Sequence, residues 1–263
     1  MLATASQLVL RNINDLNGKV LVVEPMADSL ATELHHLSPE LELSCYSTDA
    51  AAAACWNHDY VTLYTDVSPQ FTGTFDTVVL FYPKSKEQLA FTLGQLKSII
   101  STNTEIFVCG DNKGGIKSLA SHAQKLGLGA NKLDNAKHCL WFSLFGDFSR
   151  LANVSASSFT INAAGEALTL HSLPGVFNHG KLDIGTALLL DNLPDVSQGK
   201  VLDFACGAGA RVRRGVGRSG ALVTYGRRDD RPWRGDGRGG APAGSRRPGR
   251  GRSRRGAGQS GPG

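Results

Sequence analysis

A glycine-containing turn after a short apolar run is the pattern in this chain with the clearest chemical meaning. Residues 200–204 form the run, which includes Asp203, and Ala205-Cys206-Gly207-Ala208-Gly209 follows it. Ligands of doubly wound α/β sheets bind beyond the carboxyl ends of the strands. A turn there must let the backbone approach the ligand, and glycine permits this because it has no Cβ. The pattern predicts a ligand-binding turn, although a plain strand–turn–helix corner would look the same.

The glycine spacing separates two classes of cofactor. A dinucleotide-binding G-x-G-x-x-G turn would need a third glycine at position 212, which is Val212. An acidic residue at the strand end followed by the pair Gly207 and Gly209 instead resembles motif I of class I methyltransferases. This resemblance implies that the cofactor is S-adenosylmethionine.

The preceding segment makes the resemblance more specific. Leu173-Pro174-Gly175-Val176-Phe177 and Leu182-Asp183-Ile184-Gly185-Thr186 are similar to the entry of small-subunit ribosomal RNA methyltransferases of the C type. Upstream, residues 81–86 and 106–112 also resemble that family's N-terminal half, so the resemblance spans residues 1–210. The family methylates the exocyclic N2 amine of a guanine in 16S ribosomal RNA, which is therefore the expected partner, alone or within the small ribosomal subunit.

The resemblance implies cofactor contacts at eight positions. Four would line the methionine end of the cofactor: Phe177, Asp183, Gly185 and Thr186. Four belong to the strand end and its turn: Asp203, Ala205, Gly207 and Gly209. Asp203 would orient the cofactor amino group as a carboxylate facing a cation, and Ala205 departs from the commoner glycine. From the residues alone, Asp183 fits equally well as a helix N-cap, and Phe177 as ordinary core.

The family's substrate loop has no counterpart after this turn. The resemblance implies an N-P-P-F loop whose Asn and neighbouring carbonyls accept hydrogen bonds from the guanine amine while the aromatic ring stacks on the flipped base. No N-P-P occurs in the 263 residues. The nearest analogue, Phe81-Tyr82-Pro83-Lys84, lacks the Asn. We therefore expect no catalytic residue in this chain, no methyl transfer by it, and doubtful cofactor binding.

A weak internal repeat suggests two related α/β units. Residues 18–25 align with residues 199–206, but the first copy continues as Val23-Glu24-Pro25-Met26 without glycine. Helical spacing over residues 28–37, 86–100 and 115–127 alternates with strands at 75–82, 105–109 and 139–144, which predicts a mainly parallel sheet. The expected fold is thus a degenerate class I methyltransferase-like, Rossmann-like domain followed by the beginning of a second such domain.

The expected division has four parts. Residues 1–145 form the degenerate domain, and residues 146–172 a connector with a hairpin at 159–161 and 167–170. Residues 173–210 begin the cofactor-binding domain, with a helix at 184–193 and a strand at 200–204. Because an isolated opening strand and helix cannot build a sheet, we expect this third part to be poorly ordered.

Residues 211–263 differ sharply in composition from the rest. Residues 1–210 carry 13 Lys and Arg against 20 Asp and Glu, a net charge of −7, whereas residues 211–263 carry 15 Arg against 3 Asp, a net of +12, with 15 Gly. Such a composition predicts disorder. An Arg/Gly arm that binds RNA is one explanation. We favour out-of-frame translation, because the change falls abruptly inside a motif and Arg is the only basic residue.

Other features exclude several classes of protein. The five cysteines form no C-x-x-C pair, and the histidines have no metal-ligand spacing, so we expect free thiols, no metal, and histidines at the surface or in the core. No apolar stretch approaches the about 20 residues of a membrane helix, and the N-terminus lacks a signal peptide. The expectation is a cytoplasmic monomer. Two alternatives stay open: a non-catalytic RNA-binding module with a basic Arg/Gly arm, and another class I methyltransferase acting on protein or a small molecule.

Overall fold

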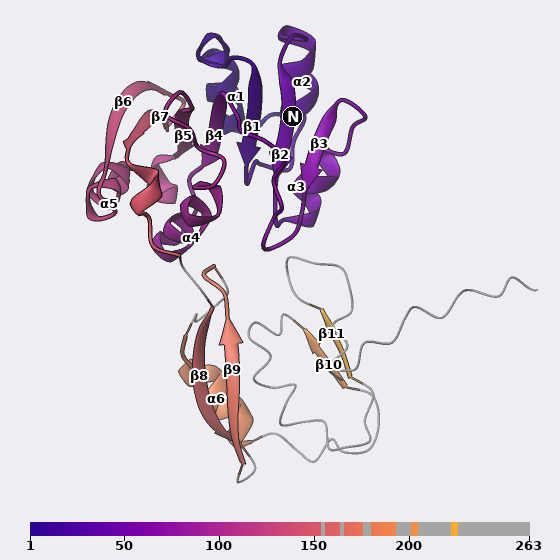
Figure 1. Cartoon of the computed structure of the whole chain (residues 1–263). Coiled ribbons are helices and arrows are strands. Elements are labelled where there is room, and N and C mark those ends of the chain that lie inside the picture. The colour runs from indigo at the N-terminus through magenta and orange to yellow at the C-terminus, as the bar shows by residue number, and fades with distance from the viewer. Residues whose placement is uncertain (154–155, 164–165, 176–179, 193–200, 205–221, 226–263) are drawn as a thin grey trace, which may run out of the picture.

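The structure, a computed structural model, describes six stretches of the chain (Figure 1). They are residues 1–153, 156–163, 166–175, 180–192, 201–204 and 222–225. A seven-stranded sheet, a separate hairpin, a short helix and a two-stranded parallel pair make up its main elements.

The seven-stranded sheet contains all the described strands of residues 1–153, in the order β3-β2-β1-β4-β5-β7-β6. Their bounds are β1 Lys19–Val23, β2 Glu42–Tyr46, β3 Val61–Tyr64, β4 Thr77–Phe81, β5 Glu105–Asp111, β6 Leu128–Ala136 and β7 Cys139–Gly146. The first five are parallel to one another, whereas β7 runs antiparallel to both β5 and β6. The predicted α/β class is confirmed, and the sheet is mixed at one side.

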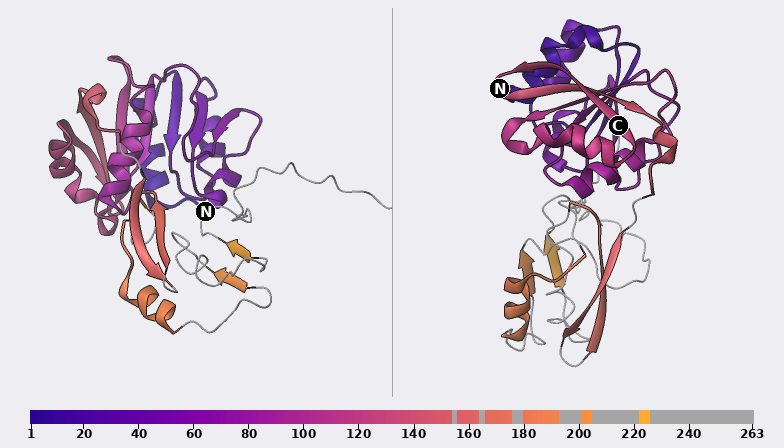
Figure 2. Two further views of the ribbon diagram at one scale, coloured as in Figure 1. Left: turned by 60° about the horizontal axis from the view of Figure 1, so that its bottom comes forward. Right: turned by 90° about the vertical axis from the view of Figure 1, so that its left-hand side faces the viewer.

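Helices cover both faces of this sheet (Figure 2). On one face lie α1 (Thr4–Arg11), α2 (Leu30–Leu37) and α3 (Ala50–Cys55), and on the other α4 (Lys86–Leu96) and α5 (Leu119–Lys125). Alternate residues of a strand point to opposite faces, so Val20 and Val22 pack toward α1 and α2, and Leu21 and Val23 toward the opposite core. A strand that is buried on both faces must be apolar throughout, which explains the run Val20-Leu21-Val22-Val23.

The predicted helices and strands of the first unit are present, with shifted ends. The helix expected at 115–127 is shorter than predicted because Gly115 takes φ +93, which lies in the left-handed region. Two 3-10 turns, η2 (Asn112–Gly114) and η3 (Ile116–Ser118), therefore precede α5. Five elements had no prediction: α1, β2, α3, β3 and β6. They are short or half-exposed, and their partners in the tertiary structure stabilise them.

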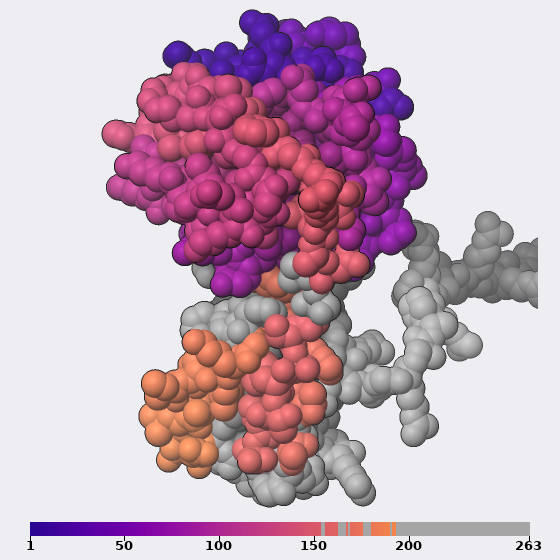
Figure 3. Space-filling model, turned by 60° about the vertical axis from the view of Figure 1, so that its left-hand side comes forward, coloured from indigo at the N-terminus to yellow at the C-terminus, as the bar shows by residue number. Residues whose placement is uncertain are grey.

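The remaining elements lie beyond the carboxyl ends of β1 and β4 (Figure 1). The 3-10 turn η4 (Phe148–Arg150) leads out of the first unit, and the antiparallel hairpin β8 (Ser157–Ala163) and β9 (Glu166–Ser172) follows. The hairpin buries Ile161 and Leu170 and packs against Leu182, just before α6 (Ile184–Asp191). In the space-filling view α6 lies beside the hairpin (Figure 3).

The structure describes parts of the second unit and a short strand after it. Among the described residues, α6 and β10 (Val201–Phe204) are formed. Leu222–Tyr225 forms β11 and pairs in parallel with β10, Val201 opposite Leu222. Leu222-Val223-Thr224-Tyr225 combines apolar, β-branched and aromatic residues, which favour a strand. The expected poor order across 173–210 and disorder across 211–263 stay predictions.

Trp141 tests the helix–sheet packing of the first unit. Its ring is fully buried, stacks on Phe107 at 5.0 Å, and donates from Nε1 to Asp15 Oδ2 at 2.9 Å. We expect Trp141→Ala to lower the free energy of unfolding by about 3–5 kcal/mol, measured by urea denaturation. Leu133→Ala on neighbouring β6, where 52% of the residue is exposed, is the control and should change it by about 0.5 kcal/mol or less.

Candidate functional site

Three of the predicted cofactor residues lie together at the start of α6. Asp183 Oδ1 accepts a hydrogen bond from the backbone N–H of Thr186 at 3.0 Å, so Asp183 is the N-cap of this helix. A Cβ on Gly185 would lie 3.2 Å from the same carboxylate oxygen. Glycine at 185 therefore keeps the space beside the Asp183 carboxylate open. The cap confirms one of the two roles predicted for Asp183 and is compatible with the other.

The other predicted contacts are described only in part. Phe177, Ala205, Gly207 and Gly209 lie outside the described residues. Asp203 belongs to β10, opposite Thr224 of β11. The structure thus shows the strand that leads into the glycine turn, and the eight predicted contacts as a set stay a prediction.

The turn that precedes Phe177 rests on the first unit. Gly175 takes φ +93, and a Cβ there would lie 3.0 Å from Gln88 Oε1. Gln88 belongs to the first turn of α4 and is buried. A glycine is needed at 175 both for its backbone conformation and for this approach. Leu173-Pro174-Gly175, which the sequence analysis noted for its resemblance alone, is therefore a contact between the cofactor segment and α4.

The turn after β1 in the first unit differs from the glycine turn that a class I fold has at this place. After β1 the chain continues with Glu24, not glycine, at φ +50. The Glu24 carboxylate accepts hydrogen bonds from Thr48 Oγ1 at 2.6 Å and from Thr48 N at 3.3 Å, in the loop after β2. Asp28 in the same turn accepts from the backbone N–H groups of Ala3 and Leu30. Carboxylates of the first unit thus bond to its own loops at the place where a class I fold has a glycine turn, which agrees with the predicted degenerate character of the unit.

A polar cluster follows β4 and β5 at the same edge of the sheet. The Tyr82 hydroxyl lies 2.9 Å from His122 Nδ1 and 3.4 Å from Ser118 Oγ. Gly110 of β5 makes room for Tyr82, since a Cβ there would lie 2.9 Å from the Tyr82 Cβ. Sequence reasoning placed His122 only as a surface or core residue. Its partner was identifiable only from the fold, because 40 residues separate it from Tyr82.

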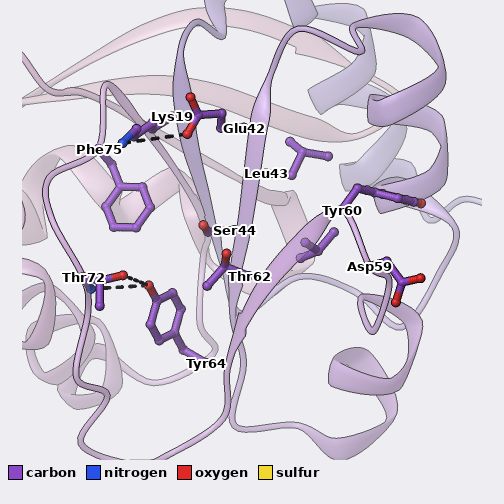
Figure 4. A pocket seen from close by; sticks show the side chains of 11 residues that line it. Lys19, Glu42, Leu43, Ser44, Asp59, Tyr60, Thr62, Tyr64, Thr72 and Phe75 are labelled. Atoms are coloured by element: carbon purple, nitrogen blue, oxygen red, sulfur yellow. Dashed lines mark hydrogen bonds and ion pairs between the residues drawn. The ribbon is translucent and has the colours of Figure 1, made fainter.

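The first unit also has a hollow of about 350 Å³ on the face of its sheet, away from these loops (Figure 4). It is lined by β1, β2, β3 and the segment before β4, among them Lys19, Glu42, Tyr60, Tyr64 and Thr72. Tyr64 and Thr72 share a hydrogen bond of 3.0 Å across it. The hollow exists because the crossover between β3 and β4 contains no helix. It contains none of the predicted cofactor residues.

The described residues also bear on the predictions of free thiols, of no metal site and of no membrane helix. Cys45 and Cys109 are buried free thiols, and burial raises the pKa of both, so these thiols stay protonated near neutral pH. Within the described stretches, no group of three His, Cys, Asp or Glu side chains is placed to hold a metal ion. The same stretches contain no helix long and apolar enough to cross a membrane.

Substitution of Glu24 tests whether its hydrogen bonds to Thr48 stabilise the first unit. Glu24→Ala removes the hydrogen bonds to Thr48 and keeps a side chain at positive φ, so we expect the free energy of unfolding to fall by about 1–3 kcal/mol. Glu24→Gly loses the same bonds but relieves the left-handed backbone, and should be about 1 kcal/mol more stable than Glu24→Ala. Urea denaturation of the two variants measures the difference. Equal stabilities would contradict the strained backbone at this position.

His122 should make stability depend on pH. Burial, followed by the charges of Lys86 and Lys125, lowers the pKa of His122 below its usual value of about 6.5. The unfolded chain then takes up the proton at higher pH than the folded one. Stability is full above about pH 6.5 and falls as the pH decreases below it. Thermal melts between about pH 7 and 5 should show a smaller decrease for His122→Gln than for the wild type, whereas exposed His36→Gln should leave the decrease unchanged.

Known families and structures match this chain along most of its length. The family described as methyltransferase small domain N-terminal matches residues 6–160, and the methyltransferase small domain family matches residues 167–212. A T. thermophilus 16S rRNA N2 methyltransferase, solved in complex with AdoMet and guanosine, superimposes with a TM-score of 0.66 at 18% identity over 86% of this chain and 63% of that one. That likeness supports the fold.

Curated relatives share one description. Ribosomal RNA small subunit methyltransferase C of Pseudoalteromonas translucida is 38% identical over 80% of this chain and 62% of its own length. The protein of the same description from Acinetobacter baumannii is 33% identical over 78% of this chain and 60% of its own length. The chain thus spans about three fifths of these relatives. The resemblance noted in the sequence is confirmed, and the chain belongs to the ribosomal RNA small subunit methyltransferase C family.

Proposed function

We propose that the chain derives from an S-adenosylmethionine-dependent methyltransferase that acts on the N2 amine of a guanine in 16S ribosomal RNA. The observation that carries this proposal is the start of α6, where Asp183 lies beside Gly185 and Thr186. The strand β10, which leads into the glycine turn, supports it. Family membership supplies the substrate class, since the relatives are described as ribosomal RNA methyltransferases.

The described residues fit the cofactor in the second unit and do not fit it in the first. Gly185 leaves space at the Asp183 carboxylate, which suits a cationic group of the cofactor. In the first unit the corresponding turn carries Glu24, whose carboxylate bonds to Thr48 in the loop after β2. We therefore assign the cofactor to the segment that begins at residue 173 and assign residues 1–145 a supporting role.

Each residue of the proposed site has a role in binding or orientation. Asp183 would hold the methionine end through its carboxylate while it caps α6, together with Phe177, Gly185 and Thr186. Asp203 would orient the cofactor amino group, and Ala205, Gly207 and Gly209 would form the turn along its backbone. S-adenosylmethionine, when bound, supplies an electrophilic methyl group on a sulfonium. A substrate loop is needed to align the guanine amine with that methyl group.

The proposal extends to this chain only as far as binding. The N-P-P-F loop that the family resemblance implies is missing from the 263 residues. That the chain transfers no methyl group stays a prediction. A filter assay with radiolabelled S-adenosylmethionine and 16S ribosomal RNA checks it, and methyl incorporation by this chain would contradict it.

Asp183 provides the test of the cofactor site. Asp183→Asn can still cap α6 but carries no charge, so we expect affinity for S-adenosylmethionine to fall about tenfold or more, because hydrogen bonds to charged groups contribute about 1.5–3 kcal/mol. Isothermal titration calorimetry measures the affinity, and circular dichroism checks that the helix persists. Asp191→Asn, at the exposed end of the same helix, is the matched control. If Asp183→Asn and the wild type bind S-adenosylmethionine with equal affinity, Asp183 acts only as a helix cap. If the wild-type chain does not bind S-adenosylmethionine, the proposed cofactor binding by this chain is wrong.

A further inference from the structure

One face of the first unit's sheet is uncovered over β2 and β3. On this face α4 and α5 cover the neighbouring strands, and the hollow of about 350 Å³ lies over β1, β2 and β3 (Figure 4). Residues 65–76, which connect β3 to β4, are described and contain no helix. This part of the sheet is therefore open to a partner.

Polar side chains line the hollow where β2 and β3 face it. They are Glu42, Ser44 and Thr62. A strand that a helix covers is usually apolar, as Leu21 and Val23 of neighbouring β1 are. The polar lining does not suit an apolar helix, and it favours a partner with charged or hydrogen-bonding groups.

The charge of the hollow is negative. Glu42 and Asp59 line it, and both are exposed. Lys19 lies 3.8 Å from Glu42, but the two side chains are 56% and 72% exposed, and an ion pair so exposed is weak. Among the residues that the structure describes, Asp59 has no cationic side chain within 4 Å. Both carboxylates can therefore accept a further cation.

The charge of the surrounding sequence has the same sign. Residues 1–83 carry 2 Lys and Arg against 10 Asp and Glu, a net charge of −8. A positively charged partner is therefore attracted to this part of the first unit as a whole, in addition to the two carboxylates of the hollow.

The same chain contains a segment of equal and opposite charge. Residues 226–263 carry 11 Arg against 3 Asp, a net charge of +8. The guanidinium group of Arg is planar, matches a carboxylate with two parallel hydrogen bonds, and is more weakly hydrated than an ammonium group. Arginines of this segment thus have the chemistry that the carboxylates of the hollow can bind.

The segment is long enough to reach the first unit. The 38 residues of 226–263 follow Tyr225, the last residue of β11. A coil of this length spans about 35 Å on average, which is comparable with the width of about 30–40 Å of a domain of about 150 residues. Because the two partners belong to one chain, their effective concentration is on the order of millimolar, and weak ion pairs then suffice.

We propose that the hollow over β2 and β3 is a binding surface for the Arg-rich residues 226–263 of the same chain, with Glu42 and Asp59 as acceptors for arginine. The contact is autoinhibitory in effect, since arginines bound to carboxylates are not available to other polyanions. This inference goes beyond the proposed function, because it requires neither the cofactor nor ribosomal RNA.

Limited digestion of the full chain with trypsin tests the contact, because trypsin cleaves after arginine and a bound segment is protected. Mass spectrometry gives the initial rate of cleavage within residues 226–263. We expect this rate to be about fivefold or more lower at about 50 mM salt than at about 500 mM salt, because salt screens exposed ion pairs. A short arginine peptide, digested in the same two buffers, corrects for the effect of salt on trypsin.

A double variant locates the contact in the hollow. Glu42→Gln with Asp59→Asn should lose the protection at low salt. The matched control is Glu33→Gln with Asp191→Asn, which removes the same charge from α2, on the opposite face of the sheet, and from α6. The control should keep the protection. Thermal melting checks that both variants fold.

Four outcomes decide the result. Protection lost only in the hollow variant supports the proposal. A wild-type chain whose cleavage rate does not change with salt would overturn it. Equal loss in the two variants would overturn it as well, because the effect would then be one of net charge. Protection kept by the hollow variant would assign the segment to another surface and would also overturn the proposal.

Competition by a polyanion tests the autoinhibitory effect. The probe is a fluorescein-labelled oligothymidylate, and fluorescence anisotropy at about 50 mM salt gives its affinity for the full chain. We expect the hollow variant to bind it about threefold or more tightly than the control variant, because arginines released from the hollow become available to phosphates. Equal affinities of the two variants would contradict the autoinhibitory effect.

Discussion

The parallel pairing of β1 with β4 is the constraint on which the rest of the first unit depends. Both strands are buried on both faces, and Val20 lies opposite Thr77 in a register that continues to Val23 and Leu80. Strand order reverses at this pair, so the loops after β1 and β4 diverge to opposite sides and leave a crevice between them. The Glu24–Thr48 and Tyr82–His122 pairs both involve loops at this edge.

The residues that follow the first strand of each unit distinguish the two units. In the first unit, the Glu24 carboxylate accepts a hydrogen bond from Thr48 in the loop after β2. In the second, the sequence has a glycine turn after β10, and Asp183 lies beside a glycine at the start of α6. The two turns therefore differ in the room that they leave for a ligand, because a Glu side chain occupies space beside the strand end and a glycine does not.

The contact of Gly175 with Gln88 links the two units. It places Gly175 against Gln88 of α4. The link is local and depends on a glycine at positive φ, so it does not follow from the sheet alone.

The sequence by itself determined the class of fold and the family, and it predicted a cofactor turn. Apolar runs such as Val78-Val79-Leu80 can be buried only inside a sheet covered on both faces, and glycines at 207 and 209 have few reasons to follow such a strand. Short elements such as β3 and β6 were not predictable, because their stability comes from neighbouring strands. The pairing of β10 with β11 was likewise not predictable, since a run of four residues within an Arg/Gly-rich segment carries little signal alone.

Only the tertiary structure decided which distant side chains meet. Tyr82 and His122, Glu24 and Thr48, and Gln88 and Gly175 are each separated by 24 to 87 residues, and no spacing rule joins them. Sequence periodicity reports which face of an element is buried. The register of β1, β4 and β5, the close approach at Gly110 and the turn at Gly115 determine what that face touches, and these follow from packing of the whole sheet.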